Sequence, residues 1–294
     1  MKTLLGGTRV LVKEQGVSNM LYESLERALL GILMALESQG KTNSSRGFEY
    51  KELLFHNIVI NDPTAIVISN PKRKFNERYS IAEFLWYLSA DRSVVNISKL
   101  AQMWAKIADS QFEVESNYGE YILPQWEWVI NELKNDMGSR RAVITINQPY
   151  HKDKNPKDVP CTQYLQFFIR DGYLSLGVQM RSNDVIYGFC NDVYNFCLFQ
   201  QAMLNELKQT YPDLKLGKYY HMAGSMHLYD TSFNMSKEII DYYLYTEDDG
   251  TIKHRVLDPN FSILNNTKMK LPSRNMSKEE LNEYVDLAAI KLFP

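Results

Sequence analysis

The most informative stretch of this chain is Arg181-Ser182-Asn183-Asp184-Val185-Ile186-Tyr187-Gly188-Phe189-Cys190-Asn191-Asp192. It follows residues 173–180, where apolar and polar side chains alternate as in a strand, and it leads into residues 192–209, which we expect to form a long helix. The guanidinium of Arg181 has the planar shape that binds phosphate oxygens in pairs. The stretch therefore predicts a binding site where a strand passes into a helix.

Composition limits the class of protein. The chain has 294 residues, of which 45% are hydrophobic, and this is enough for one large α+β domain over residues 1–294. The formal net charge of -2 predicts no basic surface for nucleic acid. No apolar stretch is long enough to span a bilayer, and Arg9, Lys13 and Glu14 interrupt a start that otherwise resembles a signal peptide.

Cysteine usage points to a reducing compartment. The three cysteines, Cys161, Cys190 and Cys197, are an odd number without the spacing of a zinc site. We therefore expect a cytoplasmic protein with no metal, no nucleic-acid partner and no membrane partner.

Periodicity predicts strands in the middle of the chain and helices towards both ends. Asp171-Gly172 is a two-residue hairpin signal between two strands. Asn-Met-Ser-Lys-Glu occurs at Asn234 and at Asn275, and each copy is expected to start a helix, the second with a capping box from Ser277 to Glu280. The fold class predicted is α+β, with helices flanking a twisted mixed sheet. The expected helices are 18–39, 80–88, 93–107, 124–135, 192–209 and a last one through Leu292, and the expected strands are 53–60, 65–69, 141–147, 162–170, 173–180 and 219–228.

Cys161 is the candidate nucleophile. It follows a polar loop over residues 152–158 and Pro160, and it stands at the entrance to the strand 162–170. A single cysteine is more often an inert buried thiol than a catalytic group. Arg181, however, stands at the end of the partner strand of the hairpin, close enough to favour a thiolate.

The stretch from Arg181 to Asp192 resembles the nucleotide-binding signature of the thymidylate synthase family, Arg-Ser-x-Asp-x-x-x-Gly-x-x-x-Asn, with Asp192 in place of the final Asn. Pro160-Cys161 resembles the nucleophile segment of that family, and Ala82-Glu83-Phe84-Leu85-Trp86-Tyr87-Leu88 resembles the helix that carries its catalytic glutamate. Further landmarks follow in the family's order: Trp104, Tyr118-Gly119, Arg140-Arg141 and His227-x-Tyr229. Arg46 resembles the N-terminal phosphate-binding arginine.

The resemblance implies a thymidylate synthase-like fold and a complete set of site residues. The implied co-substrate is 5,10-methylenetetrahydrofolate, and the implied assembly is a homodimer in which Arg140 and Arg141 reach the nucleotide phosphate of the partner. Catalytic roles fall to Cys161, Glu83 and Asp192; substrate binding to Arg46, Tyr118, Arg140, Arg141, Arg181, Ser182, Asn183, His227 and Tyr229; and cofactor binding to Trp104, Asp184 and Gly188.

Several positions depart from most thymidylate synthases and resemble the phage-type deoxycytidylate hydroxymethylase branch. Thr162 stands where most members have His, Met180 where they have Gln, and Ile107 where they have a second tryptophan. The last residues, 290–294, do not resemble the family's terminal lid. Such enzymes make 5-hydroxymethyl-dCMP, so a product with a hydroxymethyl rather than a methyl group is expected.

Asp192 bears on the choice of base. A carboxylate accepts a hydrogen bond from the cytosine amino group, whereas O4 of uracil would face it as a second acceptor. A one-residue gap would instead place Asn191 at this position and indicate an ordinary thymidylate synthase acting on dUMP. A dCMP methyltransferase, a CMP hydroxymethylase and a hydroxymethylase acting on dUMP remain alternatives. Cys161 together with Glu83 argues against a silent nucleotide- or RNA-binding relative.

Overall fold

The computed structural model describes residues 20–154, 157–246, 251–266 and 268–294. Within them the chain forms one eight-stranded sheet in the order β1-β3-β8-β6-β5-β4, with β2 added to β3 and β7 added to β8. The strands are β1 (Met20–Tyr22), β2 (Lys41–Ser45), β3 (Phe48–Ile60), β4 (Val143–Thr145), β5 (Thr162–Arg170), β6 (Tyr173–Met180), β7 (Asn183–Asp184) and β8 (Lys215–Tyr229).

The sheet is mixed. Strand β3 runs antiparallel to β8, whereas β6 and β8 are parallel and are connected through a long helix. The helices are α1 (Leu25–Gln39), α2 (Glu77–Tyr87), α3 (Met103–Ile107), α4 (Gly119–Asn135), α5 (Gly188–Lys208), α6 (Phe233–Tyr245) and α7 (Lys278–Leu292), with 3-10 turns at Ile97–Lys99, Pro149–Asp153 and Asp230–Ser232. The prediction of an α+β fold with a mixed sheet flanked by helices is confirmed.

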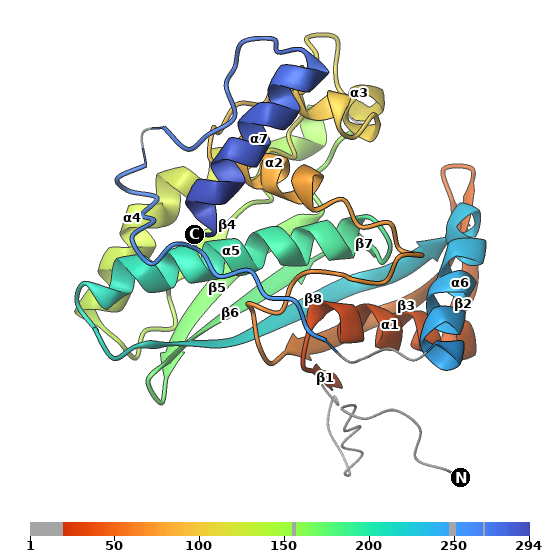
Figure 1. Cartoon of the computed structure of the whole chain (residues 1–294), viewed down its shortest axis with the longest axis horizontal. Coiled ribbons are helices and arrows are strands. Elements are labelled where there is room, and N and C mark those ends of the chain that lie inside the picture. Colours follow the sequence, from red (N-terminus) through yellow and green to blue (C-terminus); the bar gives the residue numbers. More distant parts are fainter. Residues whose placement is uncertain (1–19, 155–156, 247–250, 267) are drawn as a thin grey trace.

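Helix α5 lies across the sheet and organises the core (Figure 1). It is buried on nearly all sides because it contacts β6 and β8 on one side and α2 and α4 on the other. The Nε2 of its buried Gln200 donates to the carbonyls of Leu174 and Gly217 at 3.0 and 3.1 Å and so ties the helix to the strands β6 and β8. The helix therefore holds its N-terminal residues rigidly at the end of β7.

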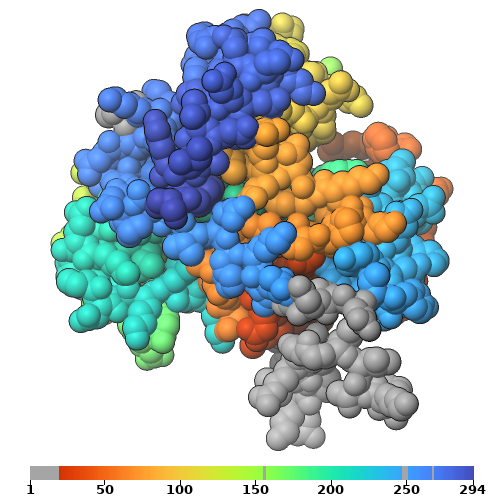
Figure 2. All heavy atoms as spheres, in the orientation of Figure 1, coloured from red at the N-terminus to blue at the C-terminus, as the bar shows by residue number. Residues whose placement is uncertain are grey.

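Helices α2 and α7 complete this layer. They lie side by side on the face seen in Figure 2, where Arg78 of α2 pairs with Asp286 of α7 at 2.8 Å. Along β6 the apolar side chains Leu174, Leu176, Val178 and Met180 are buried beneath helices, and the alternate side chains are half-buried or exposed on the other face of the sheet.

Two segments do not have the structure predicted for them. Residues 65–69 were expected to form a strand, yet they make only an isolated bridge between Val67 and Lys253. Residues 93–107 were expected to form one helix and instead form two short ones, because Val94 pairs with Phe112 through the backbone and the Asn96 amide donates to carbonyls beyond residue 270. Hydrogen bonds to distant residues thus prevent the single helix that the periodicity of residues 93–107 predicts.

Several predicted boundaries also move. Helix α1 begins at Leu25 rather than residue 18, because Ser24 caps it by accepting from the Arg27 N–H and residues 20–22 pair with β3. Helix α4 begins at Gly119, five residues before the predicted start, with Pro124 inside it. Helix α6 begins just before Asn234. The capping box of α7 is confirmed, since Ser277 and Glu280 exchange hydrogen bonds of 2.7 and 3.1 Å.

Other boundary shifts are small. Strand β4 covers only 143–145 of the predicted 141–147, helix α5 begins four residues early, and β8 begins at Lys215. Strand β3 is longer than predicted and forms an unpredicted hairpin with β2. Arg9, Lys13 and Glu14 lie outside the described residues. None of the described helices is long and apolar enough to cross a membrane.

Candidate active site

The β5–β6 hairpin brings Cys161 and Arg181 together. Asp171 and Gly172 close the hairpin with φ of +52° and +76°, the left-handed conformations of a tight turn. At its open end the Arg181 N–H donates to the Cys161 carbonyl at 2.8 Å. The Arg181 guanidinium donates to the carbonyls of Pro160 and Val159 at 3.2 and 2.7 Å. Arg181 therefore shapes the segment that presents the thiol.

Charges of both signs surround the Cys161 sulfur. Burial raises the pKa of this half-buried thiol; the Arg181 guanidinium opposes that effect most strongly, and Arg46 opposes it more weakly. The carboxylates of Asp192 and Asp158 raise the pKa further. In the unliganded protein the thiol is therefore the favoured form, and the arginines are the groups that stabilise the thiolate.

Arg46 reaches this region from the β2–β3 hairpin. Arg46 and Gly47 form its two-residue turn, with φ of +53° and +82° as in a type I′ turn. The charge of Arg46 lowers the pKa of both Cys161 and Tyr229, so its field reaches the sulfur and the tyrosine hydroxyl. The sequence alone did not predict this hairpin.

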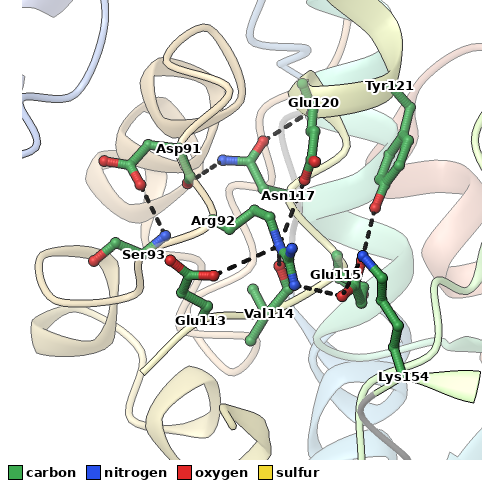
Figure 3. A network of polar contacts seen from close by, with 12 residues as sticks. Asp91, Arg92, Ser93, Glu113, Val114, Glu115, Asn117, Glu120, Tyr121 and Lys154 are labelled. Carbon is green, nitrogen blue, oxygen red and sulfur yellow. Dashed lines mark hydrogen bonds and ion pairs between the residues drawn. The ribbon is translucent and has the colours of Figure 1, made fainter. Parts of the chain in front are cut away.

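The segment preceding Cys161 is anchored by buried carboxylates. Asp158 is buried and accepts from the backbone N–H and the hydroxyl of Ser116 at 2.8 and 2.5 Å. Lys154 approaches Glu115 at 3.6 Å, and Arg92 pairs with the same carboxylate from the opposite side (Figure 3). Glu115 is itself buried, and the two cations offset the cost of burying its charge. Residues 154 and 158 are thereby fixed to the loop before α4.

Glu83 is buried on α2 between two hydrogen-bond donors. The Tyr79 hydroxyl, one helical turn earlier, donates to Oε1 at 2.5 Å, and the Asn195 amide of α5 donates to Oε2 at 2.8 Å. Trp104 donates in turn to the Tyr79 oxygen at 2.9 Å. Burial raises the pKa of Glu83 to about 8, and the neighbouring Asp192 adds to this rise against the effect of Tyr79. Glu83 is therefore protonated at neutral pH and can hold or release a proton.

Asp192 lies in the first turns of α5. Asn183 Nδ2 donates to its Oδ2 at 2.7 Å. Burial raises the pKa of Asp192 to about 7, and Asp184 contributes to the rise while Asn183 opposes it. The charge of Asp192 also raises the pKa of Glu83 and of Cys161, so the three residues predicted to be catalytic are electrostatically coupled, and we refer to them as one cluster.

The neighbouring Asn191 has other partners. Ser80 donates to its Oδ1 at 2.7 Å, and its Nδ2 donates to the Tyr187 carbonyl at 2.7 Å. Both ends of this amide are therefore engaged within the protein.

The sugar-binding candidates stand on β8. The Nδ1 of His227 lies 3.4 Å from the Ser182 hydroxyl oxygen. The His227 ring packs edge-on against Tyr229, with ring centroids 4.8 Å apart. Burial lowers the pKa of His227, and the Asp184 carboxylate opposes that shift. Tyr118 is buried, stacks on Tyr87 at 5.3 Å, and has its pKa raised by Asp192 and Cys161 as well as by burial. These residues therefore surround the same cluster.

Arg140 and Arg141 do not join the cluster within one chain. Both are exposed before β4, and Arg141 Nε donates to Glu132 of α4 at 2.9 Å. The sequence predicted that these residues act on a partner subunit, and their exposure leaves them accessible to one.

The three cofactor candidates make contacts within the protein. The Trp104 N–H is used by Tyr79. Asp184 accepts from the N–H groups of Ile186 and Tyr187 at 3.2 and 3.0 Å and so closes the turn before α5. A Cβ on Gly188 would lie 2.9 Å from Asn183 Nδ2, so only glycine fits here without displacing that amide.

Sequence reasoning missed several partners of these residues. Tyr79 stands four residues before Glu83 and Asn195 three after Asp192, spacings that place each pair on one helix face. His221 of β8 contacts Asn183 and is itself contacted by the Tyr219 hydroxyl, and no local sequence signal marks these contacts. No group of three or more His, Cys, Asp or Glu side chains within the described ranges is placed to hold a metal ion.

Comparison with known proteins gives a consistent result. The family model described as "Thymidylate synthase" matches residues 58–290. The chain is 27% identical over 243 residues to the deoxycytidylate 5-hydroxymethyltransferase of Enterobacteria phage T6, covering 78% of this chain and 94% of that protein. The corresponding enzyme of phage T4 is 28% identical over 227 residues, 71% of this chain and 88% of that protein. The deoxyuridylate hydroxymethyltransferase of Bacillus phage SP01 is 26% identical over 281 residues, 87% of this chain and 70% of that protein.

Proposed function

Because the chain belongs to the thymidylate synthase family, we propose that it converts deoxycytidylate to 5-hydroxymethyl-deoxycytidylate. Membership confirms the resemblance seen in the sequence and makes the chain an enzyme of one-carbon transfer to a pyrimidine nucleotide. The observation that supports the choice of nucleotide is Asp192, a carboxyl group whose charge acts on both Glu83 and Cys161.

Asp192 supplies the hydrogen-bonding pattern that cytosine requires. Its Oδ2 already accepts from Asn183, so the other oxygen is left for the base. That oxygen accepts from the cytosine amino group, and the raised pKa of Asp192, about 7, allows Oδ2 to share a proton with N3 while it still accepts from Asn183. With uracil the same oxygen would meet O4, a repulsion between two acceptors. The engagement of Asn191 elsewhere supports Asp192 as the reader of the base.

Cys161 performs the covalent step. Its thiolate adds to carbon 6 of the pyrimidine, which places the displaced electron pair on carbon 5 and makes that carbon nucleophilic. Loss of the thiolate from carbon 6 at the end of the cycle restores the ring double bond. Arg181 stabilises the thiolate form, and the family resemblance supports a role for its guanidinium and for Ser182 in binding the nucleotide phosphate.

Glu83 is the group that exchanges protons with the ring and with the water that becomes the hydroxyl group. Its carboxyl is protonated at neutral pH because of burial, and Tyr79 and Asn195 hold it in one orientation. A carboxyl group with this pKa can give a proton to the ring and take one from the water that becomes the new hydroxyl group. Ile107 stands where most family members have a second tryptophan, and a smaller side chain there is consistent with admission of water to the site.

The family's co-substrate fits residues at the start of α5. Tyr187 is largely exposed, and the Arg73 guanidinium lies 5.3 Å from its ring, while Arg73 Nε is buried without a hydrogen-bond partner. The exposed ring of Tyr187 suits stacking by a flat ring system, and the nearby positive charge of Arg73 favours an anionic group. When bound, 5,10-methylenetetrahydrofolate supplies one carbon at the oxidation level of formaldehyde. Trp104 and Asp184 stand nearby as supports for Tyr79 and for the turn at Tyr187.

A homodimer would complete the phosphate site. Arg140 and Arg141 lie outside the cluster of their own chain and are exposed, so they meet the phosphate only if a second copy presents them. The half-buried face of β5 and β6, opposite α5, carries Tyr164, Gln166 and Phe168, which suits a subunit contact.

Product analysis tests the proposal. The purified protein is incubated separately with dCMP, dUMP and CMP in the presence of methylenetetrahydrofolate, and each product is identified by mass. We expect dCMP to gain the mass of a hydroxymethyl group, with release of tetrahydrofolate. Turnover of dUMP in preference to dCMP would overturn the assignment.

A deoxyuridylate hydroxymethyltransferase is the second candidate. The phage SP01 protein of that name aligns over a longer part of this chain, 281 residues, at nearly the same identity as the deoxycytidylate enzymes. The same product analysis separates the two because it compares dCMP directly with dUMP.

A further inference from the structure

Asn183 is fully occupied by contacts within the protein. Its Nδ2 donates to Asp192 Oδ2 at 2.7 Å, and its Oδ1 lies 3.1 Å from His221 Nε2. Only 3% of the residue is exposed. The sequence resemblance assigned Asn183 to substrate binding, but an amide engaged at both ends is suited to orienting its neighbour.

His221 gives these hydrogen bonds a single direction. It is completely buried, and burial lowers its pKa to about 3, so the ring is neutral and carries one N–H. The Oδ1 of Asn183 can only accept, which places that N–H on Nε2. Nδ1 then accepts from the Tyr219 hydroxyl at 3.0 Å. Donation therefore runs from Tyr219 to His221, from His221 to Asn183, and from Asn183 to Asp192.

Packing holds this chain of hydrogen bonds in place. Phe189 packs edge-on against the His221 ring, with centroids 5.2 Å apart and planes at 84°. Gly188 lies so close to the Asn183 amide that a Cβ there would come within 2.9 Å of Nδ2. The amide is thus confined on the side opposite His221.

We propose that Tyr219, His221 and Asn183 are positioning residues that fix which atom of residue 192 accepts a hydrogen bond from the protein and which atom faces the base. The proposal rests on the proposed role of Asp192. With Asp192, the Asn183 N–H holds Oδ2 and leaves Oδ1 to accept from a cytosine amino group. With asparagine at 192, the same N–H holds the amide oxygen and leaves the NH2 to donate to O4 of uracil. We call Tyr219, His221 and Asn183 the relay. The relay therefore increases the preference for dCMP when residue 192 is aspartate and the preference for dUMP when it is asparagine.

Nucleotide binding in two backgrounds tests the relay. Dissociation constants for dCMP and dUMP are measured by calorimetry without folate, in the wild-type protein and in Asp192→Asn, each with and without His221→Phe. His221→Phe removes the donor to Asn183, so the Asn183 amide can rotate and exchange the positions of Oδ1 and Nδ2. We expect it to reduce the preference for dCMP in wild type by roughly tenfold, and to reduce the preference for dUMP in Asp192→Asn by a similar factor, since one hydrogen bond to a charged or buried group is at stake.

A second pair of variants separates hydrogen bonding from packing. His221→Gln places an amide N–H near the position of Nε2, so it should preserve most of both preferences. Tyr219→Phe removes only the hydroxyl that fixes the position of the His221 proton, so it should act in the same direction as His221→Phe but more weakly. The relay thus predicts that His221→Phe moves the preference towards dUMP in wild type and towards dCMP in Asp192→Asn. A general loss of packing is not expected to move it in opposite directions.

The titration of Asp192 provides a readout that needs no substrate. The carboxyl carbon is followed by 13C NMR, with Asp192→Asn used to assign the signal. The Asn183 hydrogen bond lowers the pKa of Asp192, so His221→Phe should raise that pKa and His221→Gln should not. The groups that share the electrostatic environment of Asp192 are Asp184, Glu83, Cys161, Cys190, Tyr79, Tyr87, Tyr118 and Tyr219.

The outcomes distinguish the relay from the proposed function. If folded His221→Phe and Tyr219→Phe leave both specificity ratios and the Asp192 titration unchanged, the relay is wrong. If the Asp192 titration responds as expected but the wild-type protein prefers dUMP, the relay holds and the assignment of deoxycytidylate fails.

Discussion

Replacement of Glu83 by glutamine should remove a pH-dependent loss of stability. In the folded protein burial raises the pKa of Glu83 from 4.5 to about 8. Between these values the folded state binds a proton that the unfolded state has released, so the free energy of unfolding falls as pH rises. The penalty is absent below pH 4.5, grows up to pH 8 and is constant above it. At about 1.4 kcal/mol per pH unit over a shift of about 3.5 units, it reaches about 5 kcal/mol.

The glutamine variant keeps the size and most of the hydrogen bonds of the site. Its amide oxygen can accept from Tyr79, and Asn195 can turn its amide so that Oδ1, which is buried without a partner, accepts from the new NH2. We therefore expect Glu83→Gln to match wild type at pH 4.5 and to exceed its free energy of unfolding by about 3–5 kcal/mol at pH 9. Glu127→Gln, at an exposed position on α4, is the control.

Urea denaturation at pH 4.5, 7 and 9 measures this difference, since equal slopes allow the midpoints to be compared directly. The pKa of Asp192 is also raised, but that group titrates in both proteins and largely cancels in the difference. A constant stability difference between wild type and Glu83→Gln over this pH range would refute the reasoning about Glu83.

Three further predictions concern the thiol, the product and the subunits. Alkylation of Cys161 by iodoacetamide should accelerate as pH rises, and Arg46→Gln should slow it at pH 8 by a few-fold, because Arg46 lowers the pKa of that thiol. An unchanged rate would remove Arg46 from the site, and the buried Cys190 and Cys197 serve as internal controls. Cys161→Ala should lose turnover but retain nucleotide binding, measured by product mass and calorimetry, and more than a trace of hydroxymethylated product would exclude Cys161 as the nucleophile. Inactive Arg141→Ala and Cys161→Ala proteins should regain part of their activity when subunits are mixed, up to about a quarter if exchange is random; exchange without recovery would contradict a phosphate site shared between subunits.

The sequence predicted the centre of this structure well because its signals there are local. Asp171-Gly172 set the β5–β6 hairpin, and its register places Cys161 beside Arg181. The Ser277–Glu280 capping box likewise depends only on residues within one turn. Where neighbouring residues determine the backbone, a pattern of a few residues is sufficient.

Prediction failed where distant contacts determine the structure. Residues 93–107 have helical periodicity, but backbone pairing with residues 112–114 and the Asn96 contacts beyond residue 270 break the helix. The role of His221 was also missed, since its partner Asn183 is 38 residues away and contacts it only after β7 pairs with β8. Family resemblance identified Asp192 but could not identify the side chains that orient it.

The specificity ratio of Asp192→Asn tests the central claim most directly. The quantity measured is kcat/KM for dCMP divided by kcat/KM for dUMP, in wild type, in Asp192→Asn and in the adjacent control Asn191→Asp. A buried mismatch of donors or acceptors costs about 1–3 kcal/mol, so Asp192→Asn should move the ratio towards dUMP by roughly tenfold or more. Asn191→Asp should leave it nearly unchanged, because Asn191 is bound to Ser80 and Tyr187. A large change at position 191 with none at position 192 would contradict the assignment of a cytosine nucleotide.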